Sequence, residues 1–186
     1  MRALLILTLL AGCASPPTDL YTLAALPGPP AHTPRRSIEL RRIGLAAYLD
    51  RPQIIRSHAD YRLRVADSDR WGEPLGGMLG RVLTEDLVQR LPDAAIFLET
   101  GAISTRPDLV LEIDVQRFDP DADNSVVLLA QIALRPDSGT TTGATARTVR
   151  LTSLPASAST QDLAAALSRT LGSLADTVAA SVASMR

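Results

Sequence analysis

The feature that most limits how this chain can fold is a long stripe of apolar residues, at helical spacing, near its end. Between Thr160 and Met185, apolar residues recur at spacings of three and four. They are Leu163, Leu167, Leu171, Leu174, Val178 and Val182. This spacing places all six on one face of a helix, and such a face is buried against another element. Ser159 or Thr160 can cap the N-terminus of this helix, and Asp162 suits its first turn.

A second helix and several strands complete the predicted fold. Apolar residues at helical spacing predict a helix from Pro74 to Leu91, which Pro92 ends. Alternating or mostly apolar runs predict strands at 20–23, 37–40, 43–45, 53–56, 61–65, 95–98, 109–116, 126–134 and 146–151. Turns are expected at 67–69 and 119–124, and a polar hairpin loop at 135–143. The pattern predicts a single α+β domain, a mixed β-sheet with two main helices packed on it, in which 37–45 and 95–98 are parallel.

The start of the chain has the features of an export signal. A short positive segment, Met1–Arg2, precedes nine mostly apolar residues, and Leu10-Ala11-Gly12-Cys13 follows. Nine residues are too few to span a bilayer, which needs about 20. Leu-Ala-Gly-Cys resembles the bacterial lipobox, so we predict a signal peptide at 1–12 and a lipid on Cys13. An ordinary secretory signal with a free cysteine beyond the cut is the alternative.

The prolines suggest where the packed domain begins. Six of the 13 prolines fall between residues 16 and 34. This density predicts that residues 13–35 form a flexible, proline-rich region that follows the lipidated Cys13. The α+β domain is expected to cover residues 36–186.

Composition excludes several kinds of site. The chain has no lysine, one cysteine and two histidines, and its formal net charge is −1. No P-loop or Schiff-base lysine is therefore possible, and a Cys/His zinc site lacks ligands. We predict no enzyme activity, no metal, no cofactor and no nucleic-acid partner, because nucleic-acid binders usually carry a basic excess.

Three segments carry a resemblance to a known family. They are Tyr48–Ile55 (YLDRPQII), Arg70–Leu75 (RWGEPL) and Val82–Leu87 (VLTEDL). Together with the lipobox and Leu20–Leu23, they resemble the PqiC/YmbA family of ABC-type transport auxiliary lipoproteins. The resemblance implies an accessory subunit of an MCE-type ABC lipid transport system, with an MCE-domain protein, a permease and an ATPase as partners. Ala14 after Cys13, as in similar lipoproteins, favours a lipid anchor in the outer membrane, facing the periplasm.

The same segments supply the predicted partner-binding residues. They are Tyr48, Leu49, Asp50, Arg51, Pro52, Trp71, Glu73 and Pro74. Tyrosine, tryptophan and arginine are common at the centres of interfaces, although a structural turn, with Trp71 packed on the following helix, is the other interpretation. Two functions stay open: a non-catalytic adaptor, or a periplasmic lipid-binding shuttle with an apolar cavity. A homo-oligomer is also possible.

Overall fold

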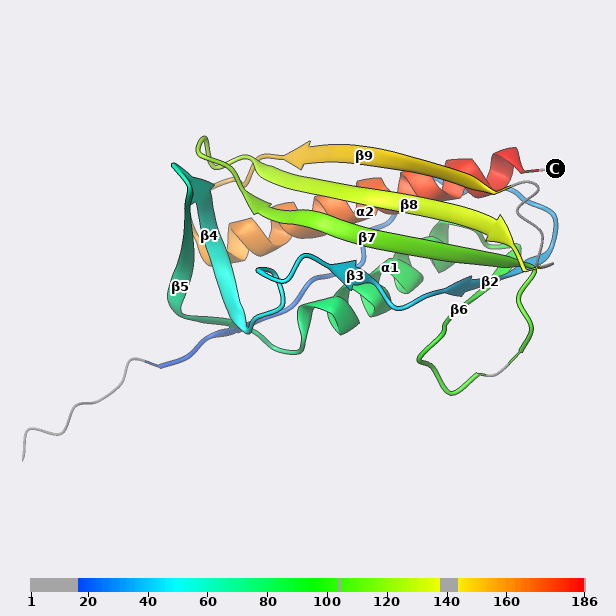
Figure 1. Ribbon diagram of the computed structural model, residues 1–186, viewed down its shortest axis with the longest axis horizontal. Helices are drawn as coiled ribbons and strands as arrows, with labels where there is room; N and C mark the ends of the chain where they lie inside the picture. The colour runs from blue at the N-terminus through cyan, green and yellow to red at the C-terminus, as the bar shows by residue number, and fades with distance from the viewer. Residues whose placement is uncertain (1–16, 104, 138–143, 186) are drawn as a thin grey trace, which may run out of the picture.

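The computed structural model describes residues 17–103, 105–137 and 144–185 (Figure 1). The predicted signal peptide at 1–12 and the predicted lipidation site Cys13 lie outside the described residues. So does most of the loop predicted at 135–143.

A large mixed sheet forms one layer of the domain. Its strand order is β6-β2-β7-β8-β9, and β3 also pairs with β7. The strands are β2 (Arg36–Leu40), β3 (Gly44–Leu45), β6 (Ala94–Leu98), β7 (Leu109–Pro120), β8 (Val126–Pro136) and β9 (Thr145–Ser153). β2 is parallel to both β6 and β7, whereas β7, β8 and β9 are antiparallel neighbours. The mixed α+β sheet is thus confirmed, including the predicted parallel pair.

Two helices cover one face of this sheet (Figure 1). They are α1 (Leu75–Arg90) and α2 (Thr160–Ser184), and they also contact each other. All six residues of the predicted α2 stripe are buried. Ser159 is the N-cap, and its hydroxyl oxygen accepts a hydrogen bond from the Asp162 backbone N–H at 3.1 Å. The predicted amphipathic helix and its cap are confirmed.

A smaller sheet closes one end of the molecule. Its order is β1-β5-β4, built from β1 (Leu20–Tyr21), β4 (Gln53–Ala59) and β5 (Arg62–Trp71). The turn predicted at 67–69 is wrong, because these residues continue β5. The Arg70 guanidinium donates to the carbonyl oxygens of Ala66, Asp67 and Asp69 at 2.8–3.2 Å, which satisfies backbone groups where the pairing with β4 shifts register.

The boundary predicted near residue 36 is also wrong. Residues 20–34, which we call the N-terminal strap, pack on the helices. Leu23 is 2% exposed, and the Leu26 N–H donates to Asp86 Oδ1 at 2.8 Å. Arg90 Nη1 donates to the Leu26 carbonyl oxygen at 2.9 Å, and the Ala31 N–H donates to the Arg90 carbonyl oxygen at 2.7 Å. Proline interrupts strand pairing, so this extended segment is held by side chains of α1. Within the described residues, no helix is both long and apolar enough to cross a membrane.

Candidate docking site

The two loops that carry the predicted partner-binding residues meet at the surface. One is residues 46–52, between β3 and β4, and the other is residues 72–74, between β5 and α1. Six of the eight predicted residues border a hollow of about 320 Å³, which we call the loop hollow. Its lining is Asp50, Arg51, Pro52, Trp71, Glu73, Pro74 and Leu75. Segments some 20 residues apart in the sequence therefore form one surface feature.

The remaining two predicted residues, Leu49 and Tyr48, attach the first loop to the interior of the domain. Leu49 is 2% exposed and belongs to the hydrophobic core. Tyr48 is half-buried, and its hydroxyl donates a hydrogen bond to Asp119 Oδ2. Burial of the ring, together with this carboxylate, raises the pKa of the Tyr48 hydroxyl, so the group stays protonated and remains a donor. These two side chains position the loop from the protein side.

A buried acid that the sequence did not reveal supports this arrangement. Asp119 is fully buried, and Arg117 Nη2 donates to its Oδ1 at 2.7 Å. We had expected Asp119 in a turn, but it continues β7. Its two-residue spacing from Arg117 puts both side chains on one face of a strand, where the guanidinium compensates the buried carboxylate. That spacing was the signal in the sequence.

Backbone contacts then join the two loops. The Trp71 N–H donates to the Pro52 carbonyl oxygen at 2.8 Å, and Arg51 Nε donates to the Tyr48 carbonyl oxygen at 2.7 Å. Trp71 is 7% exposed and packs in the core, as its structural interpretation predicts. Pro52 and Pro74 are exposed. The rim of the loop hollow is therefore stiff before any partner binds, because proline has a fixed φ and the loops are already bonded together.

Charges of both signs surround the loop hollow. Asp50 is exposed, and Glu73 Oε1 pairs with Arg81 Nη2 at 2.5 Å. Arg51 is partly exposed, and its contact within this loop is made by the Nε atom alone. An arginine with free guanidinium N–H groups can form a bidentate pair with a carboxylate of another protein.

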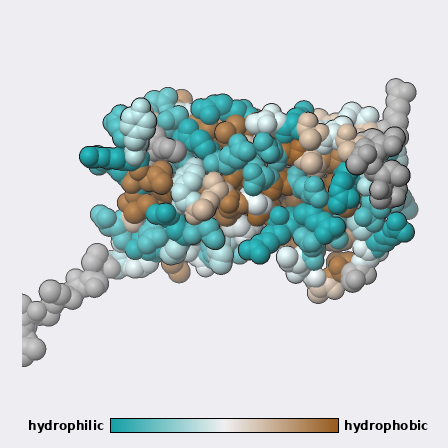
Figure 2. All heavy atoms as spheres, viewed as in Figure 1, coloured by the Kyte–Doolittle hydropathy of each residue, from teal (hydrophilic) through white to brown (hydrophobic). Residues whose placement is uncertain are grey.

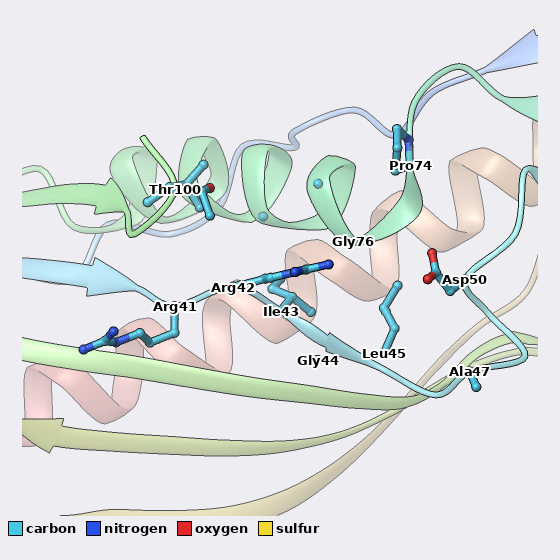
Figure 3. A pocket seen from close by; sticks show the side chains of 13 residues that line it. Arg41, Arg42, Ile43, Gly44, Leu45, Ala47, Asp50, Pro74, Gly76 and Thr100 are labelled. Carbon is cyan, nitrogen blue, oxygen red and sulfur yellow. The ribbon is translucent and has the colours of Figure 1, made fainter. Parts of the chain in front are cut away.

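A second, larger hollow of about 650 Å³ adjoins the first and shares Asp50 and Pro74 with it (Figure 3). It lies between the chain from Arg41 to Ala47 and the first turns of α1. Arg42 reaches across it toward Gly76, whereas Arg41 turns away, toward Glu99, which it contacts at 2.5 Å (Figure 3). Hydrogen bonds from the Arg42 backbone N–H and the Arg41 side chain lower the pKa of Glu99.

Glycines in α1 keep this second hollow open. Gly76, Gly77 and Gly80 line it, and a Cβ atom added at Gly77 would meet nothing within 4 Å. Three glycines in the pattern Gly-Gly-x-x-Gly destabilise a helix, so their presence inside one indicates a packing or functional reason. This pattern could have indicated the second hollow from the sequence, but it was not among our predictions.

One space among the core residues of the described chain is far smaller. A cavity enclosed by core residues, including Leu49, Trp71 and Phe118, has a volume of only about 10 Å³. Such a space holds at most one water molecule. Among the described residues, no cluster of three His, Cys, Asp or Glu side chains is placed to bind a metal ion.

One family model matches the chain, and two solved structures share its fold. The family described as ABC-type transport auxiliary lipoprotein component matches residues 20–179. A crystal structure of an uncharacterized protein superposes with a TM-score of 0.75 at 16% identity, covering 90% of this chain and 99% of the other. A crystal structure from Xanthomonas campestris, described under the family name DUF330, gives a TM-score of 0.68 at 20% identity, covering 87% and 92%. No curated protein matches the chain.

Proposed function

The chain belongs to the family of ABC-type transport auxiliary lipoprotein components, and from that premise we propose that it is a non-catalytic adaptor of an MCE-type lipid transport system. In this proposal, the lipid on Cys13 holds the protein in the outer membrane, and the domain faces the periplasm. The folded domain docks the MCE-domain protein, which works with a permease and an ATPase. The match between the predicted docking residues and the lining of the loop hollow is the observation that carries this proposal.

The packed N-terminal strap sets how far the adaptor can stand from its anchor. Only six residues separate Cys13 from Leu20, the first residue of β1. Even a fully extended chain covers no more than about 25 Å over this length. The adaptor is therefore held close to the membrane, and its partner must extend to it.

The small interior volume supports an adaptor over a lipid-binding shuttle. A shuttle must enclose an acyl chain, and ligand cavities usually have volumes of about 300–1,000 Å³. The core cavity of about 10 Å³ is far smaller. Three hollows of about 320, 650 and 670 Å³ fall in this range, but they are open surface features lined by charged side chains as well as apolar ones.

Binding measurements with surface variants test the docking site. We would change Asp50→Arg and Glu73→Arg, both on the rim of the loop hollow, and Glu85→Arg as the matched control on an exposed position of α1. The lipidated protein in detergent would be titrated with an MCE-domain protein of the same organism. Rim variants should lose about 1–3 kcal/mol of binding free energy, the range of interface hot spots, with unchanged melting temperature.

Two outcomes contradict separate parts of this proposal. Equal affinities for the rim and control variants would remove the loop hollow from the interface. An unaltered parent protein that does not bind the MCE-domain protein would contradict the partnership itself. Mass spectrometry of the mature N-terminal peptide tests the anchor, because an unmodified Cys13 would contradict it.

A further inference from the structure

The β4–β5 hairpin exposes apolar side chains that the fold does not use. Tyr61, at its tip, is completely exposed, with a relative accessibility of 108%. Leu63 and Val65, which follow at two-residue spacing, are 39% and 37% exposed. Alternation along β5 places Leu63 and Val65 on one face, and Tyr61 precedes them in the turn. Hydrophobic surface is visible over β4 and β5 in Figure 2, next to hydrophilic side chains.

Two cations lie on the opposite face of the same strand. Arg62 and Arg64 alternate with the apolar residues along β5, and both are exposed. The exposed acid Asp60 lies in the adjoining turn. The tip therefore combines an aromatic residue, aliphatic residues and two arginines beside one carboxylate.

The turn at the tip holds Tyr61 in an unfavourable conformation. Asp60 and Tyr61 have φ values of 52° and 59°, in the left-handed region. A two-residue turn of this kind favours Asn-Gly, because a bulky side chain is strained at positive φ. Glycine would adopt this positive φ without strain, yet the chain has a tyrosine whose ring is entirely in solvent. This combination favours a contact between the ring and something outside the domain.

The position of the proposed lipid anchor indicates that a membrane lies near this end of the molecule. β1 begins only seven positions after Cys13 and is parallel to β5, with Leu20 opposite Arg70 at the base of the same hairpin. In Figure 1 the described chain starts at the end of the molecule that β4 and β5 form, and α2 ends at the opposite end. Leu20, which is separated from the proposed anchor by six residues, thus lies at the end of the molecule that this hairpin forms.

Contacts with α2 fix the orientation of the hairpin. Arg56 Nη1 donates to Thr160 Oγ1 at 3.2 Å, and the Thr160 hydroxyl donates to Asp69 Oδ2. Both strands are thus tied to the start of α2, while the tip beyond them stays free. A hairpin held in this way can present its tip to a surface without rearranging.

We propose that the tip of the β4–β5 hairpin rests in the headgroup region of the membrane that carries the lipid anchor. Tyr61 lies at the boundary between headgroups and acyl chains, where amphipathic rings are favoured, with Leu63 beside it. Arg62 and Arg64 bind the phosphates of anionic phospholipids. This inference rests on the proposed lipidation of Cys13, and it gives the adaptor a second contact that fixes its orientation.

A fluorescent probe near the tip can report this contact. The chain has one cysteine, and in the lipidated protein its sulfur is blocked. An Asp60→Cys variant therefore offers one free thiol beside Tyr61, and Ile103→Cys is the control, since Ile103 is 64% exposed in the connection between β6 and β7. The labelled, lipidated proteins would be placed in phosphatidylethanolamine–phosphatidylglycerol vesicles that contain lipids brominated near the headgroup. We expect quenching of the probe at position 60 and none at position 103.

Substitutions added to the labelled Asp60→Cys protein separate the contribution of the apolar side chains from that of the arginines. Tyr61→Ser with Leu63→Ser should abolish the quenching, whereas Leu154→Ser, at an exposed apolar residue elsewhere, should leave it intact. Arg62→Gln with Arg64→Gln should shift the contact equilibrium toward the free hairpin by about fivefold per arginine, and only where phosphatidylglycerol is present.

The possible failures are distinguishable. A protein that does not float with vesicles would overturn the anchor and the hairpin contact together. A protein that floats but leaves the probe at position 60 unquenched by lipid and open to a water-soluble quencher would overturn the hairpin contact alone. A probe shielded from the soluble quencher but not quenched by lipid would also overturn it, and would assign the tip to a protein interface.

Discussion

Replacing Arg90 should destabilise the domain far more than replacing an exposed arginine of the same helix. Arg90 is 2% exposed, and its Nε donates to Asp176 Oδ1 at 2.6 Å. In an Arg90→Met variant, the Leu26 carbonyl loses its guanidinium donor, and the fully buried carboxylate of Asp86 loses the cation with which it pairs. Removing one partner of a buried ion pair costs about 3–5 kcal/mol. That is a large part of the 5–15 kcal/mol typical of a domain.

Asp86 makes the prediction more specific. Burial raises its pKa, even though the Leu26 N–H and Arg90 oppose the change, and Asp86 Oδ2 has no hydrogen-bond partner. Asn in place of Asp86 keeps an oxygen for the Leu26 N–H but removes the charge. An Asp86→Asn, Arg90→Met double variant should therefore be more stable than the sum of the single effects predicts, by about 1–3 kcal/mol.

The pH dependence has a defined sign. A carboxyl whose folded-state pKa is raised binds its proton more tightly in the native state, so its contribution to stability is greatest at low pH and is lost as the pH rises through the folded-state pKa. Without Arg90, the pKa of Asp86 rises further. The stability difference between Arg90→Met and the parent should thus narrow as the pH falls from 7 toward about 4.

Urea unfolding of the mature protein, followed by circular dichroism, measures these free energies. Arg81→Met is the control, because Arg81 is exposed and its pair with Glu73 is a surface ion pair, worth about 0–1 kcal/mol. If Arg90→Met costs no more than Arg81→Met, or if the single effects simply add, the buried ion pair does not hold the N-terminal strap as we argue.

Three further changes test other parts of the fold. Leu171→Asp places a charge on the buried face of α2 and should cost several kcal/mol by thermal unfolding; a melting temperature equal to the parent's would show that this face is not in the core. Gly28→Ala places a Cβ 2.3 Å from the buried Arg90 guanidinium, so we expect a loss of about 1–3 kcal/mol in urea unfolding, and stabilisation would contradict the close approach. Tyr48→Phe removes a donor to buried Asp119 and should cost about 1.5–3 kcal/mol in the same assay, and an unchanged stability would mean that the hydroxyl is dispensable.

The sequence predicted what depends on local periodicity. The α2 stripe, the alternation in β7 and the apolar run of β8 all appear in the structure, because burial of one face leaves its period in the residues themselves. The N-terminal strap escaped prediction for the opposite reason. Its prolines resemble a linker, and the groups that bind it, such as Asp86, lie 60 residues away in the chain.

The candidate site also has a part that the sequence predicted and a part that it did not. Family resemblance selected both loops of the loop hollow, but no local pattern showed that Tyr48 and Leu49 point inward. That orientation depends on Asp119, which lies 71 residues from Tyr48. The glycines of the second hollow were visible in the sequence, yet only the neighbouring strands give them a surface to line.

The N-terminal strap also imposes an order on folding. The Ala24 N–H donates to Ser168 Oγ at 3.2 Å, 144 positions later. A ribosome makes the strap first and α2 last, so the first segment of the domain waits for nearly the whole chain before its contacts exist. Bringing such distant segments together is slow because of the entropy of closing the long loop between them. Until those contacts form, the prolines of the strap disfavour its pairing with the edge of another β-sheet, because proline lacks the backbone N–H that such pairing needs.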